Sequence, residues 1–444
     1  MKRRAFIKQA GLAAAGAFVA PYILPSGRLF AATGARKANH VVFCMFAGGV
    51  RNIDSVNFGN GNLMTNLLSN NTAVDSDIAS AMTPLPPNPL GYTLDSKGSL
   101  FQEFRYKAGP TGHFNGHTVA LTGQYSNVDL VIRENPKVPT IFEYYRKHNS
   151  PQNAATNCWW VANTLGPYPA LNYSSAAGYG ADYGANFIAP TSLFSSAGRQ
   201  TIQNVYNFSN NDQQAINKLR GFTNQVFNHP YVNGAAGISN TENEKYLLDQ
   251  FVNSMFANFN PNPWGAGVAM NNDMMNIHYA EEIIKAFKPE LLVVNMQDVD
   301  VAHFNFTNYA NNLRKADYAV AHLWNTIQNT PGMANDTILI IAPEHGRNLD
   351  GNNSIDAYGR EALDHTANVD LTQGDQTARD IFCMVIGPPG VVKQGFTFGN
   401  SSSSVGESIE IVPAIANILG FDNVIPGSLL TPASSNQLLL NGFY

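Results

Sequence analysis

The chain has 444 residues, is 44% hydrophobic and 13% charged, and carries a formal net charge of −5. A chain of this length and apolar content buries a large core as one α/β domain or two smaller ones, which excludes a disordered or fibrous protein. Its three cysteines, an odd number at wide spacing, form neither a disulfide framework nor a zinc-finger pattern.

The first 32 residues have the layout of an export signal. Paired arginines, Arg3 and Arg4, precede Phe6, and an apolar stretch from Ala10 to Leu24 is followed by small residues. This order resembles a twin-arginine signal, and the alternatives are an ordinary Sec signal or a short membrane anchor. We therefore expect the twin-arginine (Tat) export machinery as a partner and a periplasmic or extracellular location.

Removal of this signal makes the chain more acidic. It takes five of the 27 basic residues and leaves 22 against 32 acidic ones, a net charge of −10; the five are Lys2, Arg3, Arg4, Lys8 and Arg28. We expect no nucleic-acid partner, because phosphate binding needs clustered Lys and Arg. We also expect no membrane span after signal removal, because no later segment has the roughly 18 continuous apolar residues that a span requires.

Short apolar runs rich in β-branched residues recur along the chain: "HVVFCMF" (40–46), "LLVVNM" (291–296), "TILIIA" (337–342) and "IFCMVIG" (381–387). Continuous rather than alternating apolarity is typical of strands covered on both faces. Between two of these runs, the stretch 311–328 places Leu313, Val320 and Ile327 on one helical face. This order predicts an α/β fold with a largely parallel central sheet and helices on both faces.

The segment from about 158 to 276 differs in composition. The stretches "NYSSAAGYGADYGANF" and "NFNPNPWGAGVAMNN" are rich in Gly, Asn, Tyr and Pro and have little periodicity. Their many aromatic residues favour ordered loops over the sheet rather than low-complexity disorder. We expect a single α/β domain over residues 36–444, in which this segment is a loop-rich insertion or lid.

Carboxylates and imidazoles recur beside the predicted strands, and in open α/β sheets ligands bind beyond the carboxyl ends of the strands. Three segments deliver both groups to one rim: Asp298, Asp300 and His303 after 291–296, Glu344 and His345 after 337–342, and Asp364 and His365 before 381–387. Any one of these pairs is as easily a turn, a surface pair or a helix start. Together they predict a metal site.

The chemistry of these ligands limits the metal ions that such a site would bind. Oxygen and nitrogen ligands in combination suit Zn²⁺, Mn²⁺ or iron. Two such ions about 3.5–4 Å apart clamp both the attacking and the leaving oxygen of an ester. The expected cofactor is therefore one or two divalent metal ions, with the element left open.

The same segments resemble the alkaline phosphatase superfamily, which includes sulfatases and nucleotide pyrophosphatases. The resemblance rests on "LLVVNMQDVDVAHFNF", "TILIIAPEHGR", "ALDHT" and "GESIEIVPAIANILGF", and "GHFNGHTVALTGQYSN" (112–127) is similar to the nucleophile region of that superfamily. It covers roughly residues 38–150 and 288–425. A branch of exported sulfatase-like proteins also looks similar, through "FAGGV" after the first strand and a Glu-x-Gly-Arg turn followed by Asp-His.

The resemblance implies a metal-dependent hydrolase of phosphate or sulfate esters. Matched by position, its metal ions are held by Asp300 (or Asp298), His303 and His365 at one site and by Glu344 and His345 at the other. Glu344 stands where the family usually has Asp, and both are carboxylates. Arg347, two residues beyond His345, either binds the anionic ester bidentately or forms a salt bridge at a helix start.

The chain departs from the superfamily after its first strand. The family places a metal-binding Asp-Gly there, whereas "MFAGGVRNID" has Ala47 and Gly48, and the nearest carboxylate is Asp54.

A second departure concerns the nucleophile. The family uses Thr, Ser or a modified Cys nine residues before the Thr of Leu-Thr-Gly, and the same count back from Thr122 gives His113. A histidine attacks phosphorus covalently or acts as a general base, so His113 is the candidate catalytic residue. Thr111 is two positions out of register, and His117 is a candidate for supporting the ligands from behind.

We expect an exported metal-dependent hydrolase whose substrate is a small-molecule or polymer ester of phosphate or sulfate. The alternative is a catalytically degenerate protein of the same fold with a binding or envelope-associated role, which Ala47 and His113 favour. A metal-dependent isomerase or phosphoryl transferase is a third interpretation, and the missing Thr or Ser at the nucleophile position counts against it.

Overall fold

The computed structural model of the chain describes residues 34–127, 134–149, 156–162, 171–194, 240–367 and 374–444. Within them, eight strands form one mixed sheet in the order β4-β3-β5-β1-β6-β7-β2-β8. The strands are β1 (His40–Phe46), β2 (Gly98–Arg105), β3 (Cys158–Val161), β4 (Asn186–Ile188), β5 (Leu291–Met296), β6 (Thr337–Pro343), β7 (Asp380–Ile386) and β8 (Phe396–Phe398). The predicted export signal, residues 1–32, lies outside the described residues.

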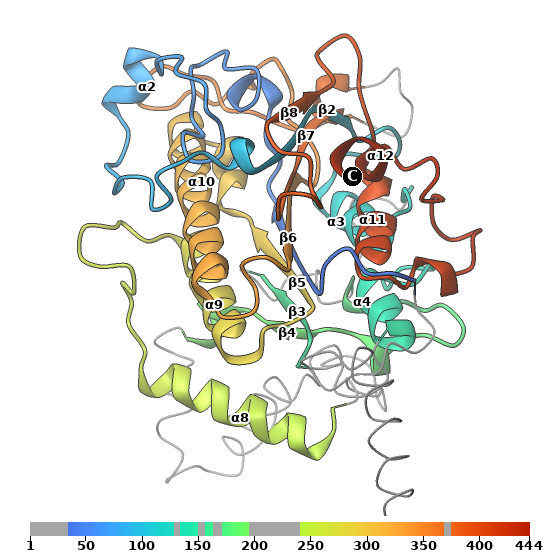
Figure 1. Ribbon diagram of the computed structural model, residues 1–444. Helices are drawn as coiled ribbons and strands as arrows, with labels where there is room; N and C mark the ends of the chain where they lie inside the picture. The colour runs from blue at the N-terminus through green and yellow to red at the C-terminus, as the bar shows by residue number, and fades with distance from the viewer. Residues whose placement is uncertain (1–33, 128–133, 150–155, 163–170, 195–239, 368–373) are drawn as a thin grey trace, which may run out of the picture.

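Helices cover both faces of this sheet. The α-helices are α2 (Ser76–Ser80), α3 (His113–Thr122), α4 (Ile141–Tyr144), α5 (Pro190–Leu193), α8 (Glu242–Ala257), α9 (Asn272–Phe287), α10 (Phe306–Asn329), α11 (Ile411–Ile418) and α12 (Gln437–Gly442). Figure 1 shows α9 and α10 on one face of the sheet and α3, α4 and α11 on the other. The predicted fold class is therefore confirmed.

Short helical turns join these elements. The 3₁₀ turns are η2 (Asn52–Asp54), η3 (Leu94–Lys97), η6 (Ala181–Tyr183), η7 (Asp298–His303), η8 (Gln376–Arg379), η9 (Ser408–Glu410) and η10 (Asp422–Val424). A π-helical turn, η4 (Tyr145–Asn149), continues α4. Of these turns, η7 follows β5 and carries three of the predicted ligands, Asp298, Asp300 and His303.

The centre of the sheet is β1, which lies between β5 and β6 and runs parallel to both. Residues 41–46 of β1 and every residue of β5 and β6 are buried. Burial on both faces explains why these strands are continuous apolar runs. Removing that apolar surface from water stabilises the fold by roughly 25 cal/mol per Å².

The strand β7 runs antiparallel to β6 and to β2. Consequently the carboxyl ends of β1, β5, β6 and β2 and the amino end of β7 lie along one edge of the sheet, which we call the carboxyl edge. The segments that follow β2, β5 and β6, and the loop that precedes β7, all begin or end there. The topology thus brings the predicted ligands from distant parts of the chain to one place.

Part of the segment expected to be an insertion belongs to the sheet. β3 pairs in parallel with β5, and β4 pairs in parallel with β3. These two short strands are therefore the last two on one side of the sheet, with β4 outermost. Strands of three and four residues give no periodic signal in the sequence, which is why they were not expected. Residues 163–170 and 195–239 of the segment lie outside the described residues.

The helix predicted over 311–328 is α10, which starts earlier, at Phe306. Asn305 caps it, since its side chain accepts a hydrogen bond from the backbone nitrogen of Asn308. Leu313 and Ile327, two residues of the predicted apolar face, are fully buried.

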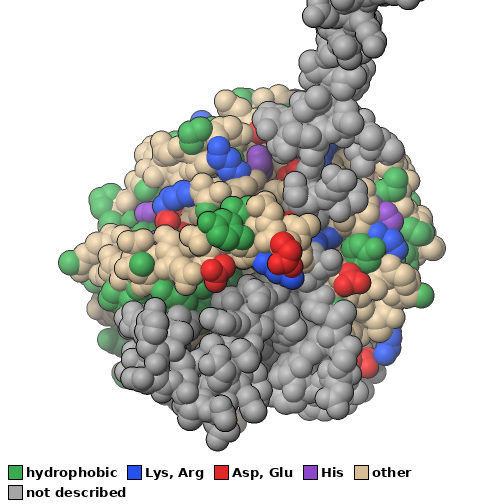
Figure 2. Space-filling model, turned by 90° about the horizontal axis from the view of Figure 1, so that it is seen from below, with side chains coloured by type: hydrophobic (Ala, Val, Ile, Leu, Met, Phe, Trp, Pro, Cys, Tyr) green, Lys and Arg blue, Asp and Glu red, His purple; other side chains and the backbone are tan. Residues whose placement is uncertain are grey.

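The surface gives two observations on possible partners. None of the described helices is long and apolar enough to cross a membrane. On the face seen from below, charged side chains of both signs lie scattered among uncharged ones (Figure 2). Among the described residues drawn on that face, the basic side chains form no continuous patch.

Candidate metal centre

Two overlapping groups of ligand-type side chains lie at the carboxyl edge. We call His113, Asp300, His303 and His365 the outer cluster, and His113, Glu344 and His345 the inner cluster. His113 begins α3, Asp300 and His303 lie in η7, and the remaining residues lie between β6 and β7. In each cluster the ligand atoms lie within 4.8 Å of one another.

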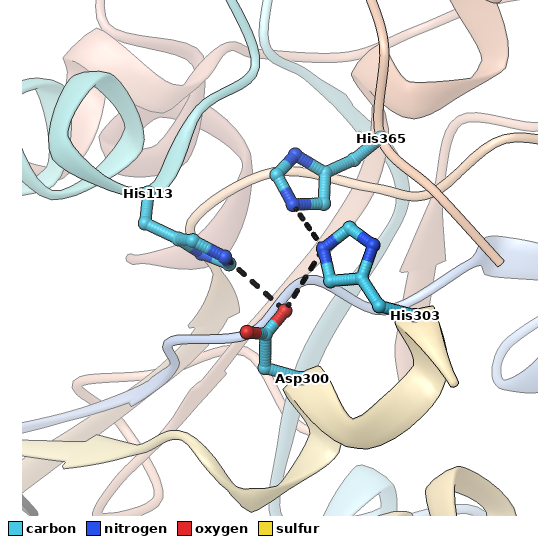
Figure 3. Close-up of side chains that lie close together, drawn as sticks. All are labelled: His113, Asp300, His303 and His365. Atoms are coloured by element: carbon cyan, nitrogen blue, oxygen red, sulfur yellow. Dashed lines mark hydrogen bonds and ion pairs between the residues drawn. The ribbon is translucent and has the colours of Figure 1, made fainter. Parts of the chain in front are cut away.

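The outer cluster is partly exposed. Asp300 Oδ1 lies 3.1 Å from His113 Nε2 and 3.4 Å from His303 Nε2. His303 Nε2 in turn lies 2.9 Å from His365 Nε2. Figure 3 shows these side chains converging from three different parts of the chain. All four side chains are partly exposed.

The inner cluster shares the partly exposed His113 with the outer one, and its other two residues are buried. Glu344 Oε1 lies 2.7 Å from His113 Nδ1 and 3.3 Å from His345 Nε2. Glu344 is 1% exposed and His345 is 0% exposed. Because His113 presents Nε2 to the outer cluster and Nδ1 to the inner cluster, one imidazole joins the two.

The outer histidines are oriented by acceptors behind them. The Nδ1–H of His303 donates to Asp364 Oδ1 at 2.8 Å, and the Nδ1–H of His365 donates to the carbonyl oxygen of Thr111 at 2.6 Å. In the neutral imidazoles these bonds leave lone pairs on both Nε2 atoms, which face each other at 2.9 Å. Two lone pairs at that distance repel each other, and a cation beside both removes the repulsion. The outer cluster therefore has the donor arrangement of a cation site.

His345 is oriented in the same way. Its Nδ1–H donates to the carbonyl oxygen of Gly346 at 2.7 Å, so its Nε2 faces Glu344. Burial lowers the pKa of His345, and burial together with neighbouring positive groups holds the pKa of His365 well below its usual range. Both imidazoles are therefore neutral at pH 7 and keep the lone pair that a metal ion needs.

Charge is concentrated around the shared imidazole. Burial alone would raise the pKa of Glu344, but the neighbouring imidazoles hold it well below its usual range. The pKa of Asp300 is also lowered, since the hydrogen bond from His113 and the charge of Arg347 outweigh its burial. Burial would lower the pKa of His113, but Glu344 and Asp300 outweigh it and raise the pKa to about 9. In the metal-free protein, protonated His113 thus supplies the positive charge between two carboxylates.

Arg347 is buried and directed inward. Its Nη2 donates to Asp300 Oδ1 at 2.6 Å and also to the carbonyl oxygen of Gly48. Its Nε and Nη1 donate to the carbonyl oxygens of Gly49 and Leu363 at 3.1 Å and 2.8 Å. The sequence left open a contact with an anionic ester or a salt bridge. In the structure this fully buried guanidinium forms an ion pair with Asp300 and donates to carbonyl groups of two backbone segments.

Three glycines permit the close approach of the ligands. A Cβ on Gly49, whose φ is +76°, would lie 2.5 Å from His345 Nδ1, and one on Gly48 would lie 2.6 Å from a backbone nitrogen of η7. A Cβ on Gly116 would lie 3.0 Å from the Cβ of Glu344. The glycine pair of "FAGGV" therefore makes room for the ligands of neighbouring strands, although Ala47 itself offers no ligand atom.

Two carboxylates that the sequence brought into consideration lie outside both clusters. Asp298 accepts hydrogen bonds from backbone nitrogens at the start of α9, at 2.8 Å and 3.2 Å. Asp54 forms an ion pair with Arg51 at 2.7 Å. Of the two aspartates in "DVD", Asp300 is the one whose side chain meets the histidines.

Thr111, the hydroxyl nearest to the expected nucleophile position, is buried and turned toward the backbone. Its Oγ1 donates to the carbonyl oxygens of His365 and Ala367, both at 3.2 Å. This arrangement leaves His113, at the first position of α3, as the side chain that faces the clusters.

The structure thus brings most of the predicted site residues together, namely His113, Asp300, His303, Glu344, His345 and His365, and leaves Asp298 and the buried Arg347 outside the clusters. Sequence reasoning missed the roles of Gly48, Gly49 and Gly116. It also passed over Asn295 in β5, which lies 2.8 Å from His117. The available signals were a glycine doublet after a strand and one polar residue inside the apolar run "LLVVNM".

The donor set of the site fits a divalent metal ion. Imidazole nitrogen and carboxylate oxygen are the ligands of catalytic zinc sites, which keep one position open for water or substrate. The same atoms also suit manganese and iron. In the partly exposed outer cluster, Asp300, His303 and His365 supply three such ligands, and His113 lies beside them.

No known family profile matches the chain, and no curated protein matches its sequence. Similar solved structures include wild-type alkaline phosphatase PafA, with a TM-score of 0.46 and 11% identity over 91% of this chain and 99% of that chain. They also include a protein in the alkaline phosphatase superfamily from Vibrio parahaemolyticus, with a TM-score of 0.42 and 10% identity over 89% and 72%. A third is the PsFucS1 sulfatase from Pseudoalteromonas sp., with a TM-score of 0.41 and 10% identity over 88% and 70%.

The chain is thus similar in structure to members of the superfamily that its sequence resembles.

Proposed function

We propose that this chain is an exported, metal-dependent hydrolase of phosphate or sulfate esters. The observation that carries the proposal is the pair of nitrogens, His303 Nε2 and His365 Nε2, that face each other at 2.9 Å beside the Asp300 carboxylate. Their other ring nitrogens are held by hydrogen bonds, so a shared cation suits the space between them. A small-molecule or polymer ester is the proposed substrate.

The proposed cofactor is one or two divalent ions, of zinc, manganese or iron. Asp300, His303 and His365 would hold one ion, Glu344 and His345 would hold a second, and His113 lies between the two sets. Such an ion polarises an ester oxygen and lowers the pKa of water.

Two residues keep the outer ligands in place. Arg347 donates to Asp300 Oδ1 at 2.6 Å, which prevents this carboxylate from rotating away from the histidines. Asp364 accepts from His303 Nδ1 and so fixes the ring and its tautomer. Both act through the ligands, and we propose no contact of either with the reacting ester.

His113 occupies the place where the resemblance leads one to expect a hydroxyl nucleophile. Its Nε2 lies 3.1 Å from Asp300 Oδ1, on the partly exposed side of the site. From there an imidazole completes the ligand set or accepts the proton of an attacking water. We propose no covalent attack by Thr111, because its hydroxyl is bonded to backbone carbonyls.

Export through the twin-arginine route, to the periplasm or the extracellular space, is part of the proposal. It rests on the sequence of the first 32 residues, with Arg3 and Arg4 before an apolar stretch. The expected absence of a nucleic-acid partner rests on the excess of acidic over basic residues.

A second candidate is a catalytically degenerate protein that binds metal and serves a binding or envelope-associated role. The observation that favours it is the absence of a ligand atom at Ala47 together with an imidazole at His113. It predicts stabilisation by metal, because a ligand that binds only the folded state raises stability, but no turnover.

One experiment separates these candidates. The protein is loaded with Zn²⁺, Mn²⁺ or Fe²⁺ in turn and assayed on phosphate monoesters, phosphate diesters and sulfate esters. We expect turnover of at least one class, reduced at least about 100-fold in Asp300→Asn and unchanged in His322→Gln, whose histidine pairs with Glu281 outside both clusters. Metal binding without turnover on any ester would favour the degenerate protein.

A further inference from the structure

A buried chain of polar groups runs from β3 across β5 to the inner cluster. Trp160 Nε1 lies 3.0 Å from Asn295 Oδ1, and Asn295 Nδ2 lies 2.8 Å from His117 Nε2. On the other side of the ring, His117 Nδ1 lies in close contact with Glu344 Oε2. Trp160, Asn295 and His117 are each 0% exposed. Polar groups buried this deeply in a core need a reason.

The hydrogen-bonding capacity of each group fixes the direction of this chain. An indole nitrogen only donates, so the atom of Asn295 that faces Trp160 must be the carbonyl oxygen. The amide nitrogen of Asn295 therefore faces His117 and donates to it. Consequently His117 Nε2 is the acceptor and carries no proton. The orientation of the amide follows from its neighbours and is not ambiguous.

The opposite nitrogen of His117 must then carry the proton. Nδ1 faces two acceptors, the carbonyl oxygen of His113 at 2.7 Å and the Oε2 atom of Glu344. The contact with Oε2 is not aligned as a hydrogen bond, so its effect is the attraction of an N–H edge for a carboxylate oxygen. The reverse tautomer would place a lone pair against both oxygens.

We infer that His117 is a positioning residue, which holds Oε2 of Glu344 on its N–H edge so that Oε1 faces the inner cluster, and that Trp160 and Asn295 fix the tautomer this requires. The inference rests on the proposed metal-dependent function and assigns a partner to Glu344, the buried carboxylate of the inner cluster. Glu344 Oε1 is the oxygen that lies 2.7 Å from His113 and 3.3 Å from His345.

Two features separate this role from ordinary core packing. The row of polar groups that starts at Trp160 ends at the carboxylate of Glu344. This carboxylate is buried in the core and also belongs to the inner cluster, so the row connects the core to the site. Asn295 is also the one polar residue of β5, where an apolar side chain would pack without needing partners. Partners behind a ligand typically contribute 10–100-fold to metal affinity.

The test is a calorimetric titration with Zn²⁺ alone on the full chain. We expect His117→Phe to bind Zn²⁺ about 10–100-fold more weakly than the wild type. His117→Gln should recover part of the loss, because its amide both donates and accepts. The matched control is His322→Gln, which removes a histidine that lies 2.5 Å from Glu281 outside both clusters and should bind Zn²⁺ like the wild type.

The tautomer has its own readout. Nitrogen chemical shifts of the His117 ring should report a neutral imidazole with its proton on Nδ1. Asn295→Asp places a carboxylate oxygen against Nε2, so we expect a proton on Nε2 in that variant, together with weaker Zn²⁺ binding. This variant keeps the test open if His117→Phe fails to fold.

The outcomes are distinguishable. Wild-type affinity in both His117→Phe and Asn295→Asp would overturn the inference and leave the proposed function standing. A wild type that binds neither Zn²⁺ nor, in the same titration, Mn²⁺ or Fe²⁺ would overturn the proposed function, and the inference with it.

Discussion

At the scale of single residues, glycines let neighbouring backbone segments lie close to the ligands of the site. Gly116 lies inside α3, where alanine is ordinarily more stable than glycine by roughly 1 kcal/mol. A Cβ at this position would come within 3.0 Å of both the Cβ and the carbonyl oxygen of Glu344. The glycine therefore lets the helix lie against the carboxylate of the inner cluster.

We predict that Gly116→Ala reverses the usual helix preference. The substitution should destabilise the protein by about 1–3 kcal/mol, because the added methyl overpacks a tight contact, and should weaken Zn²⁺ binding. Urea unfolding and metal titration measure the two effects. The control is Gly427→Ala, whose added Cβ meets no atom within 4 Å. Zn²⁺ binding at wild-type affinity in Gly116→Ala would show that Glu344 does not depend on this contact.

Arg347 allows a second prediction at this scale. Its guanidinium is fully buried and donates to Asp300 and to the carbonyl oxygens of Gly48 and Gly49. Arg347→Met leaves a charge and carbonyl groups without their donor, so we expect a loss of about 3–5 kcal/mol in the free energy of unfolding. Arg347→Lys should not rescue it, because an ammonium cannot reproduce the fork of donors. Denaturant unfolding with a loss under about 1 kcal/mol would contradict this account.

At the scale of elements, η7 and the start of α9 hold each other in place. Asp273 Oδ1 accepts from the backbone nitrogens of Gln297 and Asp298, at 2.6 Å and 3.2 Å. In return, Asp298 Oδ2 accepts from backbone nitrogens at the start of α9. A carboxylate at a helix start stabilises the unpaired N–H groups there. This exchange fixes η7, which carries Asp300 and His303.

The two aspartates of "DVD" should therefore respond differently to substitution. Asp298→Ala should lower the free energy of unfolding by about 1–2 kcal/mol, as loss of a helix cap does, and leave the metal content unchanged. Asp300→Ala should abolish metal binding at the outer cluster. Thermal unfolding and metal analysis of both variants check this. Loss of metal in Asp298→Ala, with an intact fold, would show that the ligand had been assigned to the wrong aspartate.

Some of the strands could be predicted from the sequence and others could not. The strands β1, β5, β6 and β7 agree with their predicted bounds to within one residue, because strands covered on both faces are continuous apolar runs. β3 and β4 were not predicted, because they are short and lie in a segment rich in Gly, Asn and Tyr. Their pairing with β5 and with each other is a property of the whole sheet, which local periodicity does not encode.

The candidate site likewise has a part that could be predicted from the sequence and a part that could not. The carboxylates and histidines beside predicted strands could be named from their positions, since parallel strands bring their carboxyl ends to one edge. The choice between Asp298 and Asp300 depends on the path of η7, which no spacing fixes. His113 belongs to both clusters because of the way α3 begins at the carboxyl edge, which the sequence does not specify. Arg347 points into the protein because it donates to carbonyl groups of a distant loop.

At the scale of the whole molecule, Asp317 ties α10 to a distant part of the chain. This residue is 1% exposed and accepts from the backbone nitrogens of Asn66 and Leu67 at 3.0 Å and 2.8 Å. Burial outweighs these hydrogen bonds and raises its pKa to about 7. The folded protein therefore binds this proton more tightly than an unfolded chain, in which the pKa is about 3.9.

A pH dependence of stability follows. Because the folded-state pKa is raised, the contribution of Asp317 to stability is full below about pH 4 and is lost as the pH rises toward 7. We compare the free energy of unfolding of the wild type with that of Asp317→Asn. We predict that the wild-type value minus the variant value falls by at most about 4 kcal/mol between about pH 4 and pH 8. Urea unfolding across this range measures the difference. A difference that grows with pH would contradict the raised pKa.

The central claim is that the convergent imidazoles and carboxylates of the carboxyl edge hold a metal ion. Metal analysis by mass spectrometry tests it most directly, on protein purified from its native compartment without added metal or chelator, alongside His303→Ala and His345→Ala. The account predicts about one to two equivalents of a divalent metal in the wild type and a loss of metal in each variant that retains its fold. A metal-free wild type, or folded variants with wild-type metal content, would contradict it.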